Sequence, residues 1–412
     1  IRPLRILSPH VVTLMSAGLG NAYFFQGRDY YFKDVAHLSP SNAQIYTASS
    51  MVPWSIKPLY GMWADTVAVC GFFRTPVIIF GGILGAVCLF LLAVSGMAAA
   101  VAVVFMFGVN LSVSSPDVMI DASVAEKVVE HPRFGSDLQS LCWGSMACFS
   151  VLGFGTSGLI IQAGGPETIF GILIIFGLVV FALGSLGWFG EEKTDLKPTK
   201  QFFNVFEWEG HLDVAHCGLY LFFVYALTPD VTTTMFYWYT DYEDGPQFSP
   251  IFVGIIQMSG YISMVIGIIL YNRFMTTWEF RRIFTSGQIL LLFVSMLDVI
   301  IVSRVNIKIG VPDEVVVLIS DTTLSEMMKR LIFVPMYVLA ARVCPPGAEA
   351  TVFAMFMSLS NFGSQVSIYF GSFLVHVMGI HEDNYDNFIY LIIIRSIARL
   401  FPIPLIYYLI PE

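Results

Sequence analysis

Charged residues are scarce in this chain. They make up 12% of its 412 residues, whereas hydrophobic residues make up 56%. A soluble domain has roughly 25% charged residues, so this composition excludes an ordinary soluble protein and indicates a polytopic membrane protein. Since a helix needs roughly 20 apolar residues to cross a bilayer, the chain has room for about a dozen spans.

The patterns of nucleic-acid-binding proteins, metalloproteins and enzymes are also missing. The net charge is −9 and there is no basic patch, which excludes nucleic acid as a partner. The six cysteines are scattered without CxxC spacing, so we expect packing residues and neither disulfides nor a metal site. The sequence has no HExxH, no Gly-rich phosphate loop, and no Ser or Cys nucleophile beside a local base. We therefore expect no enzyme and no cofactor.

What the chain does contain is a series of apolar segments bounded by charged residues, Pro or Gly. Twelve are predicted to be transmembrane helices: 11–32, 41–65, 74–95, 98–123, 136–162, 166–190, 211–239, 249–272, 281–303, 313–342, 346–378 and 386–410. The long polar connection from Glu191 to His211 follows the sixth segment. We predict an all-α membrane protein with an N-terminal six-helix bundle over 1–190, a cytoplasmic linker over 191–210 and a C-terminal six-helix bundle over 211–412.

The distribution of Lys and Arg predicts the orientation in the membrane. Twelve of these residues lie in the flanks and even-numbered connections, and three lie on the opposite side, namely Lys33, Arg304 and Lys308. Cytoplasmic loops carry the excess of positive charge, so both termini and the linker are predicted to be cytoplasmic.

An internal repeat relates the two predicted bundles. The stretch YYFKDVAHLSP at 30–40 recurs as YWYTDYEDGPQFSP at 237–250, and the connection at 61–74 matches 267–282 more loosely. Asp117 falls opposite Asp321 at nearly the same offset. A repeat of six helices is typical of the major facilitator fold, in which the substrate site lies near the midplane between the halves.

Two acids stand near the end of the fourth apolar segment. Asp117 and Asp121 are four residues apart, so on a helix they share one face. A carboxylate facing lipid is costly, and this face should look into the protein or a water-filled cavity. We predict that one of the two carries a coupling proton; the alternative is that both pair with basic residues of neighbouring helices.

Further ionisable residues lie within predicted spans. Arg28 and Asp29 are adjacent, and since neighbours on a helix diverge by about 100°, we expect one to face the cavity and the other to pair laterally. Lys57, between Pro53 and Pro58, either bridges to Asp117 or Asp121 or contacts substrate.

The tenth and last segments also carry charges. Glu326 and Arg330, four residues apart, either neutralise each other, with Lys329 pointing elsewhere, or leave Arg330 to bind the ligand. Arg395 and Arg399 are expected either to snorkel or to pair structurally. Polar and aromatic residues on helices five, seven and eleven are candidates to line the same cavity, although helix packing is the alternative at each: Gln139, Trp143, Asp230, Tyr237, Asn361 and Gln365.

The stretch GMWADTVAVCGFFR follows the second apolar segment. It resembles the signature loop of major facilitator transporters, in which Gly allows close helix approach, Asp caps a helix end and a base closes the cytoplasmic side. The resemblance assigns gating roles to Gly61, Asp65, Gly71 and Arg74.

Longer motifs are more specific. They are PLYGMWAD, SSPDVMIDASVAEK, SDLQSLCWGSMA, LTPDVTTTMFYWYT and VPMYVLAARVCPPGAEATVFAMFMSLSNFG. Together they resemble the folate-biopterin transporter family of the major facilitator superfamily, and plant and cyanobacterial members in particular. The likeness runs over essentially the whole chain. It implies secondary active, proton-coupled transport of folates or pterins, although some members of this family take other substrates.

The function predicted from the sequence is therefore transport of a folate or pterin by a monomeric, multi-pass protein in the bilayer. Arg28, Lys57 or Arg330 would bind the ligand carboxylates, and Asp117 the aminopterin edge, with stacking from Trp143 or Tyr237. Asp121 or Asp117 would carry protons. One alternative is transport of another metabolite such as S-adenosylmethionine. The other is a membrane receptor or sensor that does not transport.

Overall fold

The computed structural model describes residues 18–94, 96–130, 135–189, 191, 193, 212–320, 323–329, 331–332, 335–336 and 349–410. For 64–66, 121–130, 135–144, 213 and 349–353 it describes only the backbone. Within this part of the chain, β pairing is limited to two isolated bridges, and helices make up the rest of the regular structure.

The first half, residues 18–193, contains long helices broken at Pro and Gly. Residues 18–30 are helical and continue into a π-helical turn. The elements that follow are η1 (Tyr31–Val35), α2 (Pro40–Ser50), α3 (Val52–Ser55), α4 (Lys57–Thr66), α5 (Thr75–Val94), α6 (Ala99–Glu130) and α7 (Gly135–Ser185). Gly165, at φ 77°, kinks α7 into two helices, which agrees with the predicted boundary between the fifth and sixth segments.

The second half, residues 212–410, continues in the same manner. Its elements are α9 (Leu212–Ala226), α10 (Thr232–Thr240), α11 (Pro250–Leu270), η3 (Tyr271–Met275), α12 (Phe280–Val302), α13 (Val305–Lys308), α14 (Asp313–Leu318), α16 (Glu349–Val377), α17 (Phe388–Ala398) and α18 (Pro402–Leu409). Residues 323–329 are also helical. Every predicted segment thus contains helix, but the seventh and twelfth are interrupted near Pro229 and Pro402, where the ring removes a backbone donor.

The predicted repeat is visible in local geometry. Ser39 and Ser249 are both N-caps with extended backbone, at ψ 154° and 157°, and each is followed by Pro at the first helical position. Proline suits this position because its missing N–H would have no partner there. The same serine–proline start therefore opens the second long helix of each half.

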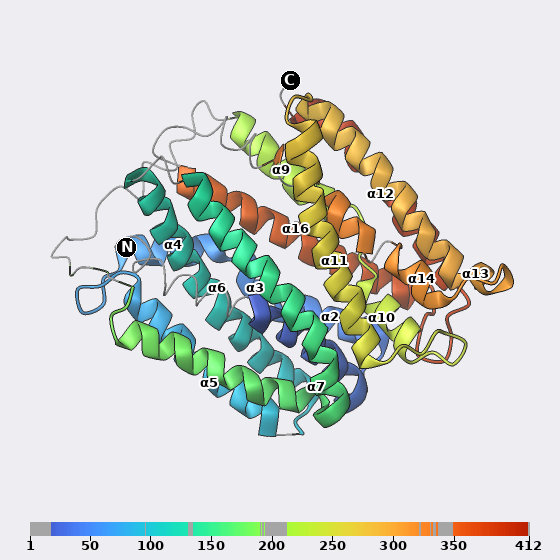
Figure 1. Ribbon diagram of the computed structural model, residues 1–412, viewed down its shortest axis with the longest axis horizontal. Helices are drawn as coiled ribbons and strands as arrows, with labels where there is room; N and C mark the ends of the chain where they lie inside the picture. Colours follow the sequence, from blue (N-terminus) through green and yellow to red (C-terminus); the bar gives the residue numbers. More distant parts are fainter. Residues whose placement is uncertain are drawn as a thin grey trace.

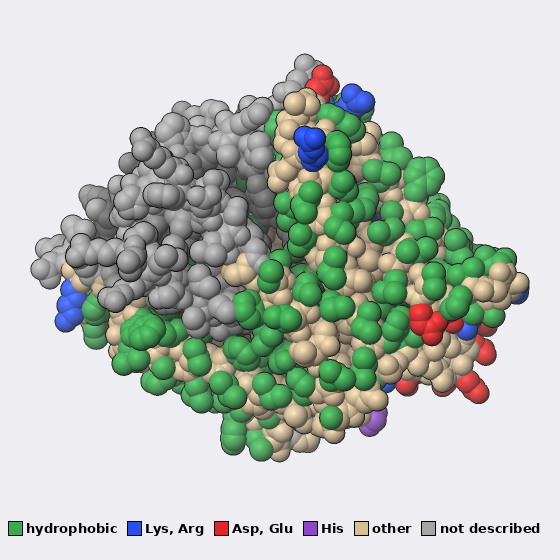
Figure 2. All heavy atoms as spheres, viewed as in Figure 1, with side chains coloured by type: hydrophobic (Ala, Val, Ile, Leu, Met, Phe, Trp, Pro, Cys, Tyr) green, Lys and Arg blue, Asp and Glu red, His purple; other side chains and the backbone are tan. Residues whose placement is uncertain are grey.

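The outer surface is suited to lipid. In the part of the chain that the structure describes, six helices are long and apolar enough to cross a membrane, α12 among them. Hydrophobic side chains cover the face formed by α11 and α12, and acidic side chains gather at the end near α13 and α14 (Figure 2). Exposed residues such as Ile266, Ile269, Leu290 and Phe293 contribute to this apolar face. The fold is an all-α membrane protein.

The two halves meet mainly where α11 packs on α7 and where α16 packs on α2, α3 and α4 (Figure 1). α11 packs on α7, where the backbone at Pro250 approaches Gly158 so closely that a Cβ would clash. α16 runs along α2 and α3, and its polar side chains bind their backbone: Asn361 Nδ2 donates to Trp54 O at 3.0 Å and Gln365 Nε2 to Met51 O at 2.7 Å. Asn361 and Gln365 therefore serve in helix packing, which was one of the two predicted alternatives.

Candidate functional site

A cavity of about 370 Å³ lies between the two halves. Aromatic side chains line it from both sides, including Phe25, Phe154, Phe236 and Tyr239. Its charged lining residues comprise four bases and four acids: Arg28, Lys329, Arg395, Arg399, Asp29, Asp230, Asp298 and Glu326. With every group ionised, the charges of these described residues cancel.

Arg28 and Asp29 form the charged wall of the first half. Arg28 donates to Asp29 Oδ1 from Nη2 at 2.7 Å and from Nε at 2.9 Å. The prediction that the two residues point apart is wrong, because the long arginine side chain folds back along the helix to reach its neighbour. Its guanidinium also lies 5.3 Å from the Phe25 ring centroid. Nη1 is buried and has no hydrogen-bond partner among the described residues, which leaves a donor available to a ligand.

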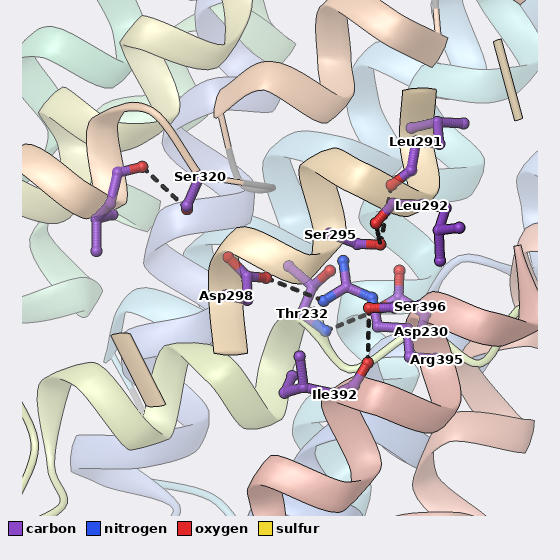
Figure 3. A network of polar contacts seen from close by, with 11 residues as sticks. Asp230, Thr232, Leu291, Leu292, Ser295, Asp298, Ser320, Ile392, Arg395 and Ser396 are labelled. Carbon is purple, nitrogen blue, oxygen red and sulfur yellow. Dashed lines mark hydrogen bonds and ion pairs between the residues drawn. The ribbon is translucent and has the colours of Figure 1, made fainter. Parts of the chain in front are cut away.

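Asp298 and Arg395 form the opposite wall. Arg395 Nη1 donates to Asp298 Oδ2 at 3.3 Å, and Asp298 is only 1% exposed. Figure 3 shows Arg395 reaching from α17 toward Asp298 on α12, with Asp230 beside it. Arg399, one turn after Arg395, is buried against the same cavity. Structural pairing, one of two predicted roles for Arg395, is therefore confirmed, and snorkelling is wrong for both arginines.

The acidic and basic residues near the tenth segment add a second pair to this wall. Lys329 Nζ donates to Glu326 Oε1 at 2.7 Å. The prediction that Lys329 points away from Glu326 is wrong, because residues three apart on a helix are also neighbours. Arg330, predicted either to neutralise Glu326 or to bind the ligand, lies outside the described residues.

Asp230 precedes α10 and lines the cavity, as one predicted alternative had it. Its Oδ1 accepts from the Thr232 backbone N–H at 2.8 Å, and its carbonyl accepts from Gln44 of the first half.

Tyr237, a predicted stacking residue, is 1% exposed and packs edge-on to Phe236, at 5.8 Å between ring centroids. It does not line the cavity in this structure.

Lys57 and Asp117 lie within the first half. Lys57 Nζ donates to Asp117 Oδ2 at 2.5 Å and lies 4.8 Å from the Trp54 ring centroid. Trp54 in turn donates to Asn110 Oδ1 at 2.8 Å. Asp117 lines a separate cavity of about 80 Å³ between α5, α6 and α7. The predicted bridge between Lys57 and Asp117 is therefore present, away from the central cavity.

Other predicted site residues fall on parts of the chain with no described side chain. These are Asp65, Asp121, Gln139, Trp143 and Arg330, and Asp321 of the repeat is outside the described residues as well.

The predicted gating segment ends at the start of α5. Gly61 on α4 faces Val118 of α6 at ordinary contact distance. The backbone N–H groups of Phe73, Arg74 and Thr75 donate to the Glu191 carboxylate at 2.8 to 3.0 Å. These hydrogen bonds hold the start of α5, directly after Arg74, against Glu191, which follows the sixth predicted segment.

The site residues predicted from the sequence did not include Asp298. Arg395 and Arg399 were not predicted to lie at the site either. A signal was present, since each is a charged residue within a predicted transmembrane segment. The Asp298–Arg395 contact joins residues 97 positions apart, however, and no local pattern connects them.

Comparison with known proteins agrees with this architecture. A model of the BT1 family matches residues 17–412. Probable folate-biopterin transporter 2 of Arabidopsis thaliana is 33% identical, over 97% of this chain and 81% of that protein. The folate-biopterin transporter of a Synechocystis species is 31% identical, over 93% and 79%.

Solved structures show the same fold at low identity. A D-xylose-proton symporter matches with a TM-score of 0.70 and 13% identity, covering 98% of both chains. A POT family transporter matches with a TM-score of 0.73 and 10% identity, covering 97% of both. These neighbours show the major facilitator fold. The chain therefore belongs to the BT1 family, in which these relatives are named folate-biopterin transporters, and it is a membrane transporter, not an enzyme.

Proposed function

We propose that this protein is a secondary active transporter of a folate or a pterin, that it works by alternating access and that proton movement drives it. One observation carries the proposal: the cavity between the halves holds buried acids, bases and aromatic rings together. A folate offers carboxylates, an aminopterin edge with N–H donors, and a flat ring. Each of these three features finds a complementary side chain in the cavity.

Arg28 is the proposed contact for a ligand carboxylate, since its buried Nη1 has no hydrogen-bond partner in the described part of the chain. Lys329, Arg395 and Arg399 supply positive charge on the opposite wall. The acids Asp29 and Asp230 suit the aminopterin edge. Arg330 and Trp143 are further proposed contacts, from the sequence.

Lys57, Asp117 and Tyr237 lie outside the lining of this cavity, so their proposed ligand contacts would require another conformation of the transport cycle. Asp121 and Asp117 are the carboxylates that the sequence proposes as proton carriers. Gly61, Asp65 and Arg74 are proposed to gate the cytoplasmic side.

The arrangement of contacts between the halves supports alternating access. Lys33, at the end of the first helix, lies 3.6 Å from Asp241, which follows α10. The Ser372 hydroxyl on α16 donates to the carbonyl of Ser41 on α2 at 2.9 Å. Both contacts join the halves beside connections that the sequence predicts on the side away from the cytoplasm. In the proposed cycle these contacts break when the cavity opens to that side.

Uptake by the purified protein in proteoliposomes would test the proposal. Labelled folate should accumulate when the outside is made acidic, and unlabelled pterin should compete with it. Empty liposomes provide the control. Competition by S-adenosylmethionine, with no effect of pterins, would favour the other metabolite. Saturable folate binding without accumulation under any imposed gradient would instead indicate a receptor and overturn the proposed transport.

A further inference from the structure

We infer that Asp298 carries the coupling proton, and that Arg395 passes from Asp298 to an anionic group of the ligand during transport. The inference rests on the proposed function and assigns its coupling step to the second half of the molecule. The sequence favoured Asp121 and Asp117 for this role.

The position of the pair is the first reason. Asp298 and Arg395 are both buried, they belong to different helices, and both line the central cavity. Asp117, by contrast, is bound to Lys57 beside a smaller cavity within the first half. A carboxylate can couple ligand binding to protonation directly only if it shares a partner with the ligand. Among the described acids that line the cavity, Asp298 meets this condition through Arg395, Asp29 through Arg28 and Glu326 through Lys329. Asp298 is the most buried of the three, with a side chain 1% exposed against 24% for Asp29 and 34% for Glu326.

The surroundings of Asp298 are the second reason. Arg395 and Arg399 face Asp298 from the last segment. Asp230, which precedes α10, and Tyr239, which lies on α10, face it as well. Ser320 lies after α14, and Glu326 and Lys329 complete the wall. At the end of α12, Arg304 and Asp313 bind each other at 2.8 Å. The exposed Tyr407 and Tyr408 of α18 lie on the outer surface.

Among the residues that the structure describes, this wall holds three acids and three bases: Asp230, Asp298, Glu326, Lys329, Arg395 and Arg399. Adding a ligand carboxylate gives the wall one surplus negative charge. Because a charge without compensation is costly at a buried site, a proton has to accompany the anion.

The exchange proceeds in two steps that balance in charge. The ligand carboxylate accepts hydrogen bonds from Arg395, the Arg395–Asp298 bond breaks, and Asp298 takes one proton from water in the cavity. When the ligand leaves on the other side, Asp298 releases that proton and binds Arg395 again. One negative charge of the ligand thus travels with one proton.

The test compares Asp298→Asn with the wild-type protein in proteoliposomes. Asparagine resembles the protonated acid, so the variant should lose at least tenfold in folate accumulation driven by a pH gradient. It should still exchange folate between loaded vesicles, and folate affinity should no longer change with pH. A pH-sensitive dye inside the vesicles should report no proton entry with folate. Asp313→Asn, which removes a paired acid away from the cavity, is the matched control and should behave as wild type.

A second variant covers the case in which Asp298→Asn does not fold. Asp298→Asn with Arg395→Gln removes the acid and the base of the pair together, so the net charge of the wall is unchanged. This variant should fold but should not accumulate folate with a pH gradient. Normal gradient-driven accumulation by either variant would overturn the inference. So would uncoupling by Asp121→Asn or Asp117→Asn with normal coupling in Asp298→Asn. Absence of accumulation by the wild-type protein itself would instead overturn the proposed function.

Discussion

At the scale of single residues, the buried charges differ in how completely their partners satisfy them. Asp29 binds two nitrogens of Arg28, whereas the third has no hydrogen-bond partner among the residues that the structure describes. A buried donor left unsatisfied costs about 1–3 kcal/mol. A ligand oxygen bound there would recover that cost, which makes Arg28 a sensitive reporter of ligand charge.

We therefore expect Arg28→Gln to weaken folate binding by about 10-fold to 100-fold, as expected for loss of a hydrogen bond to a charged group worth about 1.5–3 kcal/mol. Binding of an uncharged pterin should change much less. Isothermal titration with both ligands measures the difference. Arg282→Gln, whose guanidinium stacks over Trp278 away from the cavity, is the matched control. Equal losses for folate and pterin would contradict the role of Arg28.

Lys57 and Asp117 allow a different prediction, because they bind each other. Removing one partner of a buried ion pair costs about 3–5 kcal/mol, whereas replacing both with apolar residues is often neutral. Lys57→Met should therefore lower the melting temperature clearly, and Lys57→Met with Asp117→Leu should restore most of it. Thermal unfolding in detergent provides the measurement.

Folate binding separates the two roles of this pair. If the double variant is stable and binds folate normally, the pair is structural. If it is stable but has lost folate binding, Lys57 or Asp117 contacts the ligand in another conformation.

At the scale of elements, the start of α5 is held by an acid from outside the helix. Glu191 accepts hydrogen bonds from three backbone N–H groups and from the Thr75 hydroxyl. Partial burial raises the pKa of Glu191, but these hydrogen bonds outweigh it and hold the pKa below its ordinary value of 4.5. A capping carboxylate also interacts favourably with the positive end of the helix dipole.

Glu191→Gln should lower stability by about 1 kcal/mol, as loss of an N-cap does. The carboxylate stabilises the folded state at every pH above its unfolded pKa near 4.5, and this contribution disappears as the pH falls through the lower, folded pKa. The difference in melting temperature between wild type and variant should thus be constant at neutral pH and shrink below about pH 4.5.

Glu279 provides the control for this cap. It is the N-cap residue of α12, the helix that follows the repeated connection in the second half as α5 does in the first. Its side chain makes no capping hydrogen bond. Glu279→Gln should leave the melting temperature unchanged. A loss in Glu191→Gln no larger than in Glu279→Gln would show that the cap contributes little.

At the scale of the whole molecule, Gln44 joins the two halves. Its side chain is fully buried, donates to the carbonyls of Asp230 and Ile368, and accepts from the Thr234 hydroxyl at 3.0 Å. All three partners belong to the second half. Each buried carbonyl left without its donor would cost free energy in this conformation only.

Gln44→Leu should therefore favour the conformation in which these halves separate. A cysteine introduced at Ser325, which lines the cavity, should react faster with a membrane-impermeant thiol reagent added from the side of residues 36–39 and 241–249. Gln162→Leu, exposed on α7, is the matched control and should not change the rate. An unchanged rate in Gln44→Leu would mean that other contacts hold this side closed.

The sequence by itself determined the fold class and the family. Apolar segments long enough to span a bilayer depend only on local composition, and the breaks at Gly165 and Pro402 follow from the residues at those positions. The helix starts at Ser39 and Ser249 were likewise predictable from the repeat at 30–40 and 237–250. The long motifs also predicted the family, and the comparisons confirm that prediction.

Only the tertiary structure decided which ionisable residues share the central cavity. A helix can present a charge to lipid, to a neighbouring helix or to the cavity, and its rotation is set by packing against elements distant in sequence. Packing thus brought Asp298 to Arg395 across 97 positions and directed Lys57 to Asp117 away from the cavity. It also let Arg28 fold back onto Asp29, because side-chain length overrides the angular separation of adjacent residues.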